Sequence, residues 1–251
     1  MKHHVHAPII KREQLAIDLF RLVVEVPEIA ATCVAGQFVH LKVAEGDHPL
    51  LRRPISIFAS DGASRLELVF RVVGVGTKIL AGRVEGELLD IVGPLGEAFR
   101  LIPERRALLV GGGVGLPPIH ALFQEIRSQG LPHVVMAGIR GKDELGLIGQ
   151  LPEQAEKCLI ATDDGSLGHH GFVTELLAQE LDEGAAVYAC GPEPMLRKII
   201  ALCNEAGVPA QVSFEQQMGC GFGACIGCSI ETGEGYRRVC CEGPVFDAKI
   251  F

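Results

Sequence analysis

The stretch ALLVGGGVGLPPIHALFQEIRSQG, residues 107–130, decides the fold of this chain. A short apolar run opens it, apolar residues then recur at helical spacing from Ile119 to Ile126, and Gly130 ends the run. The pattern predicts a strand that passes through a glycine-rich turn into a helix, which is one unit of a doubly wound parallel sheet. The glycines of the turn are Gly111, Gly112, Gly113 and Gly115.

These glycines are candidate cofactor-binding residues, because they let the backbone approach a pyrophosphate at the start of the following helix. Pro117 and Pro118 depart from the usual G-x-G-x-x-G pattern of dinucleotide-binding proteins. A packing turn without a ligand has the same composition, so the residues alone leave both interpretations open.

Strand-like and helix-like segments alternate after this turn, which predicts a doubly wound α/β domain over residues 103–213. The predicted strands cover 133–139, 158–164, 185–190 and 210–214, and the predicted helices cover 144–151, 172–181 and 193–207. The strand at 185–190 runs into CGPEPML, at the strand end where ligands bind in such sheets. We therefore expect Cys190, Gly191 and Pro192 at a nicotinamide pocket, with Cys190 close to the reacting ring. A buried cysteine beside a Gly-Pro turn is the alternative.

The choice between NAD and NADP usually depends on charged residues after the second strand of such a sheet. Here Arg140, Lys142, Asp143 and Glu144 follow that strand. Because these residues carry both positive and negative charges, the sequence leaves the choice between NAD and NADP open.

The first 102 residues contain short apolar runs separated by turn residues, which predicts an antiparallel β-barrel. RRPIS at 52–56 brings an arginine, an extended proline and a serine together, which suits a phosphate and the polar edge of a flat ring. GVGTKILAGR at 74–83 offers the free amides of a helix start to a second phosphate, and a third glycine-rich corner, GPLGEAF, follows at 93–99. An edge-strand proline with solvated arginines and a plain capped turn are the alternatives. The presence of both segments on one barrel favours the binding of a dinucleotide.

The C-terminal residues 214–251 hold a cysteine motif of metal-binding type. Cys220, Cys225 and Cys228 have C-x4-C-x2-C spacing, and a fourth thiol follows at Cys240 or Cys241. This is the plant-type ligand pattern of a [2Fe-2S] cluster, and the surrounding glycines let backbone amides point at sulfur. Zinc and disulfides are the alternatives, although structural zinc usually uses two separated C-x2-4-C pairs.

Composition excludes several classes of function. The net charge of -8 among 251 residues argues against binding to nucleic acid or to an anionic membrane. The N-terminus lacks the apolar core of a signal peptide, and no apolar run of about 18 residues offers a membrane span. Nine cysteines, five of them between residues 220 and 241, favour metal ligation in a reducing compartment. We expect a cytoplasmic protein.

In sequence order, RRPIS, GVGT, GPLG, GGGVGLPP, CGPEPML and the cysteine tail resemble the ferredoxin reductase family over nearly the full length. Within that family, the RRPISI segment and the closing VCCEGPVF resemble the iron-sulfur flavoprotein subunits of class 1B dihydroorotate dehydrogenases. The resemblance assigns the fourth cluster ligand to Cys240 and leaves Cys241 as an extra thiol. Many ferredoxin reductases have an aromatic residue where this chain has Ile55, so stacking on the flavin cannot come from that position. The implied FAD contacts are Arg53, Pro54, Ile55, Ser56, Val69, Phe70, Arg71, Gly76 and Thr77.

The resemblance implies an oxidoreductase subunit that passes electrons between a [2Fe-2S] cluster, FAD and NAD(H), since a flavin links two-electron and one-electron carriers. Ser56 at the flavin edge and Cys190 at the nicotinamide are the candidate catalytic residues. The implied partner is a separate FMN-containing dihydroorotate dehydrogenase catalytic subunit, in a heterotetramer of two chains of each kind. The alternatives are a reductase subunit of a transhydrogenase or of a sulfur or sulfite reductase, a redox-inert zinc-binding module, and a redox sensor.

Overall fold

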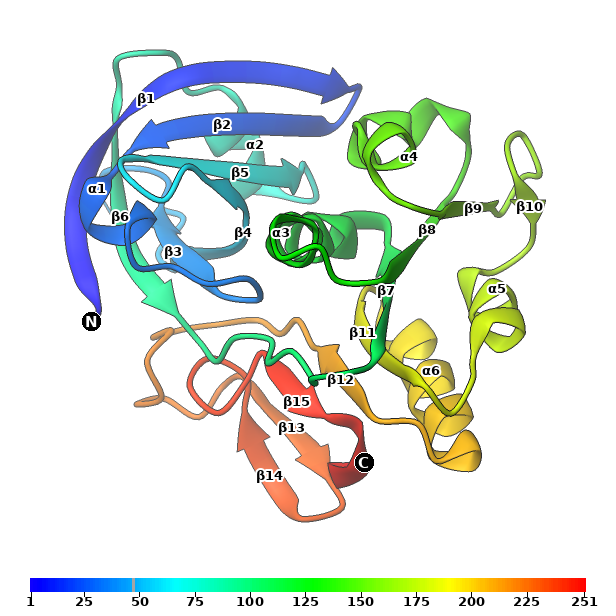
Figure 1. The fold of residues 1–251 in the computed structure, drawn as a ribbon. Coiled ribbons are helices and arrows are strands. Elements are labelled where there is room, and N and C mark those ends of the chain that lie inside the picture. The colour runs from blue at the N-terminus through cyan, green and yellow to red at the C-terminus, as the bar shows by residue number, and fades with distance from the viewer. Residues whose placement is uncertain (47) are drawn as a thin grey trace.

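The first part of the chain is a closed barrel of six antiparallel strands in the computed structural model, which describes residues 1–46 and 48–251 (Figure 1). Apolar residues alternate along the strands and fill the barrel interior, so the predicted antiparallel barrel is confirmed. The strand order is β1-β2-β5-β4-β3-β6. The strands are β1 (His3–Ala16), β2 (Leu19–Glu25), β3 (Phe38–Lys42), β4 (Arg53–Ser60), β5 (Arg65–Arg71) and β6 (Leu88–Leu95), and the short helices α1 (Pro27–Ala30) and α2 (Val75–Ala81) connect them.

The closing strand of the barrel, β1, begins earlier than the sequence pattern indicated. Its first half pairs with β6 and its second half with β2, and the two pairings together close the sheet. The apolar run from Leu15 to Val26 looks like one strand in the sequence, but a turn at Ile17 and Asp18 divides it between β1 and β2. The first half of β1 contains three histidines and a proline and has a polar, solvent-facing side, so the sequence there lacks the apolar pattern of a strand.

The second part is a seven-stranded sheet in the order β10-β9-β8-β7-β11-β12-β15. Every neighbouring pair is parallel except β12 and β15, so the predicted doubly wound parallel sheet is confirmed with one antiparallel edge strand added. The chain order reverses between β7 and β11, and ligands bind at such a point in open α/β sheets. The strands are β7 (Arg106–Gly112), β8 (His133–Ile139), β9 (Cys158–Thr162), β10 (His169–His170), β11 (Ala185–Cys190), β12 (Ala210–Ser213) and β15 (Val245–Asp247).

Helices cover both faces of this sheet. Helix α3 (Leu116–Ser128) packs between the sheet and the barrel, where His120 stacks on Phe58 of β4 at a centroid distance of 4.0 Å. Helices α5 (Val173–Glu180) and α6 (Glu193–Ala206) cover the opposite face (Figure 1). The helix predicted at 144–151 is wrong in its extent. A 3-10 turn, η2 (Lys142–Leu147), and the short helix α4 (Leu151–Gln154) replace it, because Gly149 takes a φ of +55° and interrupts the helix.

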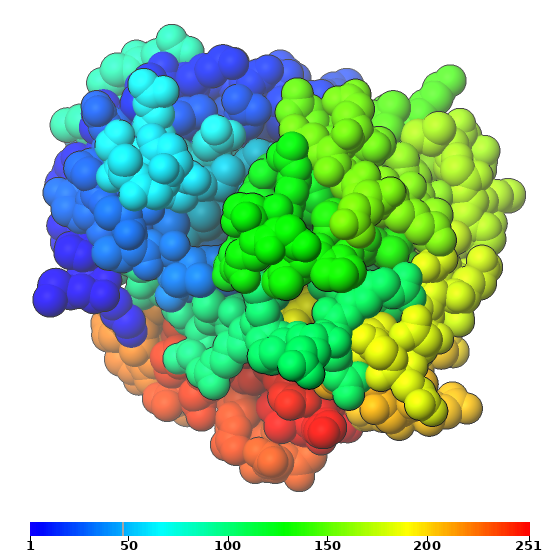
Figure 2. Space-filling model, in the orientation of Figure 1, coloured from blue at the N-terminus to red at the C-terminus, as the bar shows by residue number. Residues whose placement is uncertain are grey.

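The third part, the C-terminal segment, contacts both other parts (Figure 2). It contains the hairpin β13 (Ser229–Thr232) and β14 (Gly235–Arg238), followed by β15 and the 3-10 turn η3 (Ala248–Ile250). Strand β15 pairs with β12, and the backbone amide of Glu97, just after the barrel, donates to the carbonyl of Gly243 at 2.6 Å. The segment is therefore built into the fold and is not a loose appendage.

None of the helices in residues 1–46 and 48–251 combines the length and the apolarity needed to cross a membrane.

The two tyrosines of the chain allow a matched test of the link between the barrel and the sheet. The Tyr188 side chain on β11 is buried, and its hydroxyl accepts a hydrogen bond from the backbone amide of Ile102 at 2.8 Å. We expect Tyr188→Phe to lower the free energy of unfolding by about 1–3 kcal/mol, because this amide loses its partner. Tyr236→Phe, at a side chain that is 72% exposed, is the control and should change it by less than about 0.5 kcal/mol in denaturant titrations. Equal effects of the two substitutions would contradict the assignment.

Candidate functional site

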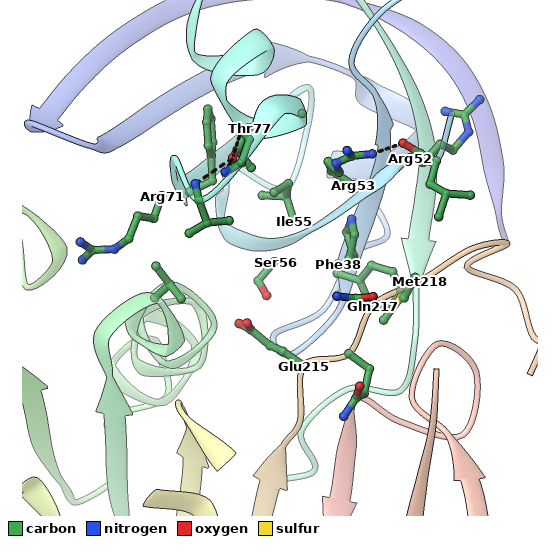
Figure 3. A pocket seen from close by; sticks show the side chains of 18 of the residues that line it. Phe38, Arg52, Arg53, Ile55, Ser56, Arg71, Thr77, Glu215, Gln217 and Met218 are labelled. Carbon is green, nitrogen blue, oxygen red and sulfur yellow. Dashed lines mark hydrogen bonds between the residues drawn. The ribbon is translucent and has the colours of Figure 1, made fainter. Parts of the chain in front are cut away.

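A cavity of about 830 Å³ opens between β4, β5, the start of α2 and the segment that follows β12 (Figure 3). Every residue for which the family resemblance implied FAD contact lines this cavity. They are Arg53, Pro54, Ile55, Ser56, Val69, Phe70, Arg71, Gly76 and Thr77. Residues more than twenty positions apart in the sequence thus meet on one concave surface, as the position of both motifs on one barrel suggested.

The Arg53 guanidinium lies directly over Gly76. A Cβ atom at Gly76 would come within 2.2 Å of Arg53 Nε, so a larger residue here would displace the guanidinium group from this position. Thr77 has a structural role in the same corner, since its hydroxyl accepts hydrogen bonds from the amides of Val73 at 2.9 Å and Gly74 at 3.2 Å. The arrangement presents a fixed cation beside a tight turn, which is suited to a phosphate group.

A second cavity, of about 1160 Å³, lies at the switch point of the sheet. Gly112, Gly113, Gly115, Gly191 and Pro192 line it, as a nicotinamide dinucleotide site requires. Gly111 is not on its wall. A side chain at Gly111 would come within 2.5 Å of Leu116, so this glycine serves the packing of β7 against α3.

Cys190 does not reach the wall of either cavity. Its side chain is 1% exposed, because every residue of β11 is buried. Burial raises the pKa of the thiol, and the charge of nearby Glu215 raises it further, although a hydrogen bond with Ser213 acts in the opposite direction. The structure therefore places a protonated Cys190 thiol behind the pocket and leaves Gly191 at its surface.

The two cavities share a wall, to which both the barrel and the sheet contribute. The residues common to both linings are Arg71, Val73, Val114, Phe214 and Glu215. Arg71 is held there by Asp18 at 2.9 Å and by Glu144 at 2.8 Å. A ligand in the first cavity and a ligand in the second can therefore face each other across the Val114 and Phe214 side chains.

Glu215 is a site residue that the sequence analysis missed. It follows β12, and its carboxyl group points into the first cavity toward Ser56 (Figure 3). Glu215 is exposed to the open cavity, but the protein atoms around its carboxyl group disfavour the charged form and raise its pKa. Its position just after the carboxyl end of a parallel strand is the signal that could have identified it.

The four predicted cluster ligands form two pairs of thiols. In the first pair, the amides of Ala224 and Cys225 donate to Cys220 Sγ at 3.2 and 3.4 Å, and the amide of Cys220 donates to Cys225 Sγ at 3.5 Å. In the second pair, the amide of Cys240 donates to Cys228 Sγ at 3.4 Å. Burial raises the pKa of the Cys220 thiol, but hydrogen bonds from backbone amides and from Cys225 outweigh it and bring the pKa down to about 6.

This pairing distinguishes between the metal centres considered for the tail. In the described part of the chain, no three His, Cys, Asp or Glu side chains are arranged around a single ion. The pairs Cys220 with Cys225 and Cys228 with Cys240 match the two cysteines that each iron of a [2Fe-2S] cluster takes. Cys240 faces Cys228, whereas Cys241 Sγ lies against Gly223 at the edge of the loop, where an added Cβ would be 2.8 Å away.

Comparison with known proteins supports this interpretation. Residues 215–251 match the family model of the iron-sulfur cluster binding domain of dihydroorotate dehydrogenase B. An electron transfer subunit of dihydroorotate dehydrogenase B (NAD(+)) from Desulforamulus reducens is 40% identical over 240 residues, covering 92% of each chain. The protein of the same name from Bacillus cereus strain B4264 is 38% identical, covering 95% of this chain and 94% of its own.

Solved structures agree with these relatives. The structure of an NADH-dependent reduced ferredoxin-NADP oxidoreductase, described in the context of flavin-based electron bifurcation, is 28% identical. It superimposes with a TM-score of 0.88 over 98% of this chain and 89% of its own. A ferredoxin NADP+ reductase from Neisseria gonorrhoeae, 19% identical over 81% of this chain and 92% of its own, has the same fold with a TM-score of 0.69.

The fold and the C-terminal domain together define an iron-sulfur electron-transfer subunit of ferredoxin reductase architecture, which is an oxidoreductase component. The chain belongs to the family of electron transfer subunits of dihydroorotate dehydrogenase B (NAD(+)). A subunit of this family works with a catalytic partner subunit.

The lowered pKa of Cys220 leads to a pH-dependent prediction for protein from which metal has been removed. A thiol reacts as the thiolate, so the rate of Cys220 alkylation should reach half its maximum near pH 6 and nearly its full value at pH 7.5. Cys158, whose pKa burial raises to about 11, is the internal control and should react far more slowly at neutral pH. Iodoacetamide labelling followed by peptide mass spectrometry measures both, and equal rates at pH 7 would contradict the assignment.

Proposed function

We propose that this chain binds FAD in the first cavity, NAD(H) in the second and a [2Fe-2S] cluster on Cys220, Cys225, Cys228 and Cys240. The corresponding parts are an FAD-binding barrel (1–102), an NAD-binding α/β domain (103–213) and a cluster subdomain (214–251). The wall that the two cavities share is the observation that carries the proposal, together with the two thiol pairs of the C-terminal segment. When bound, these groups convert two-electron hydride chemistry into one-electron transfer.

The contribution of the protein is to place the ligands and to exclude water. Arg53 supplies a positive charge for a phosphate, and Ser56 presents a hydroxyl group on the cavity surface as a partner for the polar edge of a flavin. The apolar side chains of Val114 and Phe214 lie in the wall between the two cavities, and ligands bound on both sides of this wall would displace water from the transfer path. Cys190 supports this pocket from behind, at the end of β11.

The charge arrangement at the second cavity favours NAD over NADP. Arg140, at the end of β8, is the cation best placed for a 2′-phosphate, but Glu144 binds its guanidinium group at 2.5 Å. The Glu144 side chain is 6% exposed and pairs with Arg71 as well. Its carboxylate lowers the attraction of this corner for a further phosphate, whereas the uncharged ribose of NAD is not affected.

The proposed partner is a catalytic subunit that contains FMN and oxidises dihydroorotate, in a cytoplasmic heterotetramer of two chains of each kind. The names of relatives that align over more than nine-tenths of both chains support this partner. A reductase subunit of a ferredoxin-dependent transhydrogenase is the second candidate, favoured by the likeness to the ferredoxin-NADP oxidoreductase structure. The chain is 40% and 38% identical to the dihydroorotate dehydrogenase B subunits but 28% identical to the oxidoreductase structure, which favours the dihydroorotate-oxidising partner.

The proposed division of labour predicts the activity of the isolated chain. The purified chain should oxidise NADH with an artificial acceptor such as ferricyanide, because that reaction needs only the two cavities. It should leave dihydroorotate unchanged until the catalytic subunit is added. Spectrophotometric assays of both reactions test this, and turnover of dihydroorotate by the chain alone would overturn the proposed partnership.

The role of Arg53 predicts weaker FAD binding when its charge is removed. We expect Arg53→Ala to weaken binding about 10- to 100-fold, which corresponds to the loss of about 1.5–3 kcal/mol for hydrogen bonds to a charged group. Arg65→Ala, at an exposed arginine on the neighbouring strand β5, is the matched control and should leave binding unchanged. Fluorescence titration of the apoprotein with FAD gives both constants, and unchanged affinity in Arg53→Ala would contradict the assigned contact.

A further inference from the structure

The side chain of His40 is completely buried outside the barrel interior. Its neighbours on β3, Val39 and Leu41, belong to the barrel core. Because successive side chains of a strand point to opposite faces, His40 and Phe38 share the outer face. Phe38 lines the first cavity, and His40 is 0% exposed.

The cluster loop covers this histidine. A Cβ atom on Gly221 would come within 2.4 Å of His40 Nδ1, and Gly221 has a φ of +78°. A glycine is therefore required on both conformational and steric grounds. Its neighbour Cys220 is one of the four predicted ligands, so the imidazole ring lies against the loop that carries the first thiol pair.

The two ring nitrogens of His40 have no hydrogen-bond partner among the described residues. In either tautomer, one of these nitrogens carries a hydrogen, and burying such a donor without an acceptor is costly. Backbone groups of Arg52, on the barrel, and of Cys220, on the cluster loop, both raise the pKa of the ring, whereas burial lowers it. Because Gly221 packs against Nδ1, this unpartnered nitrogen faces the cluster loop, and an acceptor on that side would satisfy it.

The backbone of His40 is fixed to the flavin side of the protein. His40 pairs in register with Pro54 of β4, which lines the first cavity. Arg52 donates to the carbonyl group of His40 at 3.4 Å and is itself anchored by Asp90 at 2.9 Å. The ring therefore belongs to a rigid strand that connects the wall of the flavin cavity to the cluster loop.

We infer that His40 is a positioning residue for the iron-sulfur centre, and that its ring N–H, which has no partner among the described residues, would donate to the Cys220 thiolate once the centre is bound. This inference rests on the proposed function, because it assumes a cluster on the four thiols. A donor at this place holds the loop at a set distance from the flavin strand. It also stabilises the more negative, reduced cluster, so it raises the reduction potential.

The test compares the wild-type chain, purified with its cofactors, with His40→Leu and His40→Gln. We expect His40→Leu to retain FAD and to show a more negative cluster potential with an altered EPR signal of the reduced cluster. His40→Gln keeps an N–H donor, so its cluster potential should lie between those of His40→Leu and the wild type. His133→Leu, at a buried histidine on β8, is the matched control and should leave potential and spectrum unchanged.

The outcomes separate this inference from the proposed function. A wild type that contains iron, with a potential and EPR spectrum that His40→Leu does not change, overturns the inference alone. A wild type without iron overturns the proposed function as well. If His40→Leu does not fold, His40→Gln takes its place, because its amide places the N–H donor differently from the imidazole ring. A shifted potential in that variant supports the inference, and an unchanged potential overturns it.

Discussion

The pairing of β15 with β12 is the constraint on which the arrangement of the sites depends. It runs antiparallel at the edge of a parallel sheet, from Gln211 opposite Asp247 to Ser213 opposite Val245. Just beyond it, the amide of Phe214 donates to the carbonyl of Pro244 at 2.9 Å. This pairing fixes the segment after β12 that lines both cavities, and it brings the chain back from the cysteine loop. One short strand pair thus positions the two cavities and the thiol pairs relative to one another.

A seam of charged residues fixes the barrel against the α/β domain beside the shared wall. Arg71 of the barrel contacts Asp18 of the barrel and Glu144 of the domain. Glu144 also pairs with Arg140. Burial raises the pKa of Glu144, but hydrogen bonds from Arg140 and the charge of Arg71 outweigh this and lower it. The carboxylate is therefore ionised and links two guanidinium groups. A pair in which both partners are hydrogen-bonded supports geometry more than it adds net stability.

The sequence was most informative where a local pattern determines local structure. Period-two and helical repeats predicted the barrel and the doubly wound sheet, and the cysteine spacing predicted the tail domain. The start of β1 was missed, because a strand that closes a barrel with a polar outer face lacks a strong apolar signal. Glu215 was missed although its position just after β12 could have identified it, whereas the burial of His40 under the cluster loop depends on a contact between distant segments and could not be predicted. Cys190 was expected on the pocket wall, but tertiary packing places its thiol behind it.

The central claim, that one chain connects a nicotinamide site to a two-iron centre through a flavin, has a direct test. The purified chain with its cofactors is titrated with NADH without oxygen, while visible absorption follows the flavin and low-temperature EPR follows the cluster. We expect the flavin absorption to bleach and the EPR signal of a reduced [2Fe-2S] cluster to appear. Iron analysis of the same protein should give about two irons per chain. Reduction of the flavin without any cluster signal, in a chain that contains iron and accepts an electron from dithionite, would contradict the account.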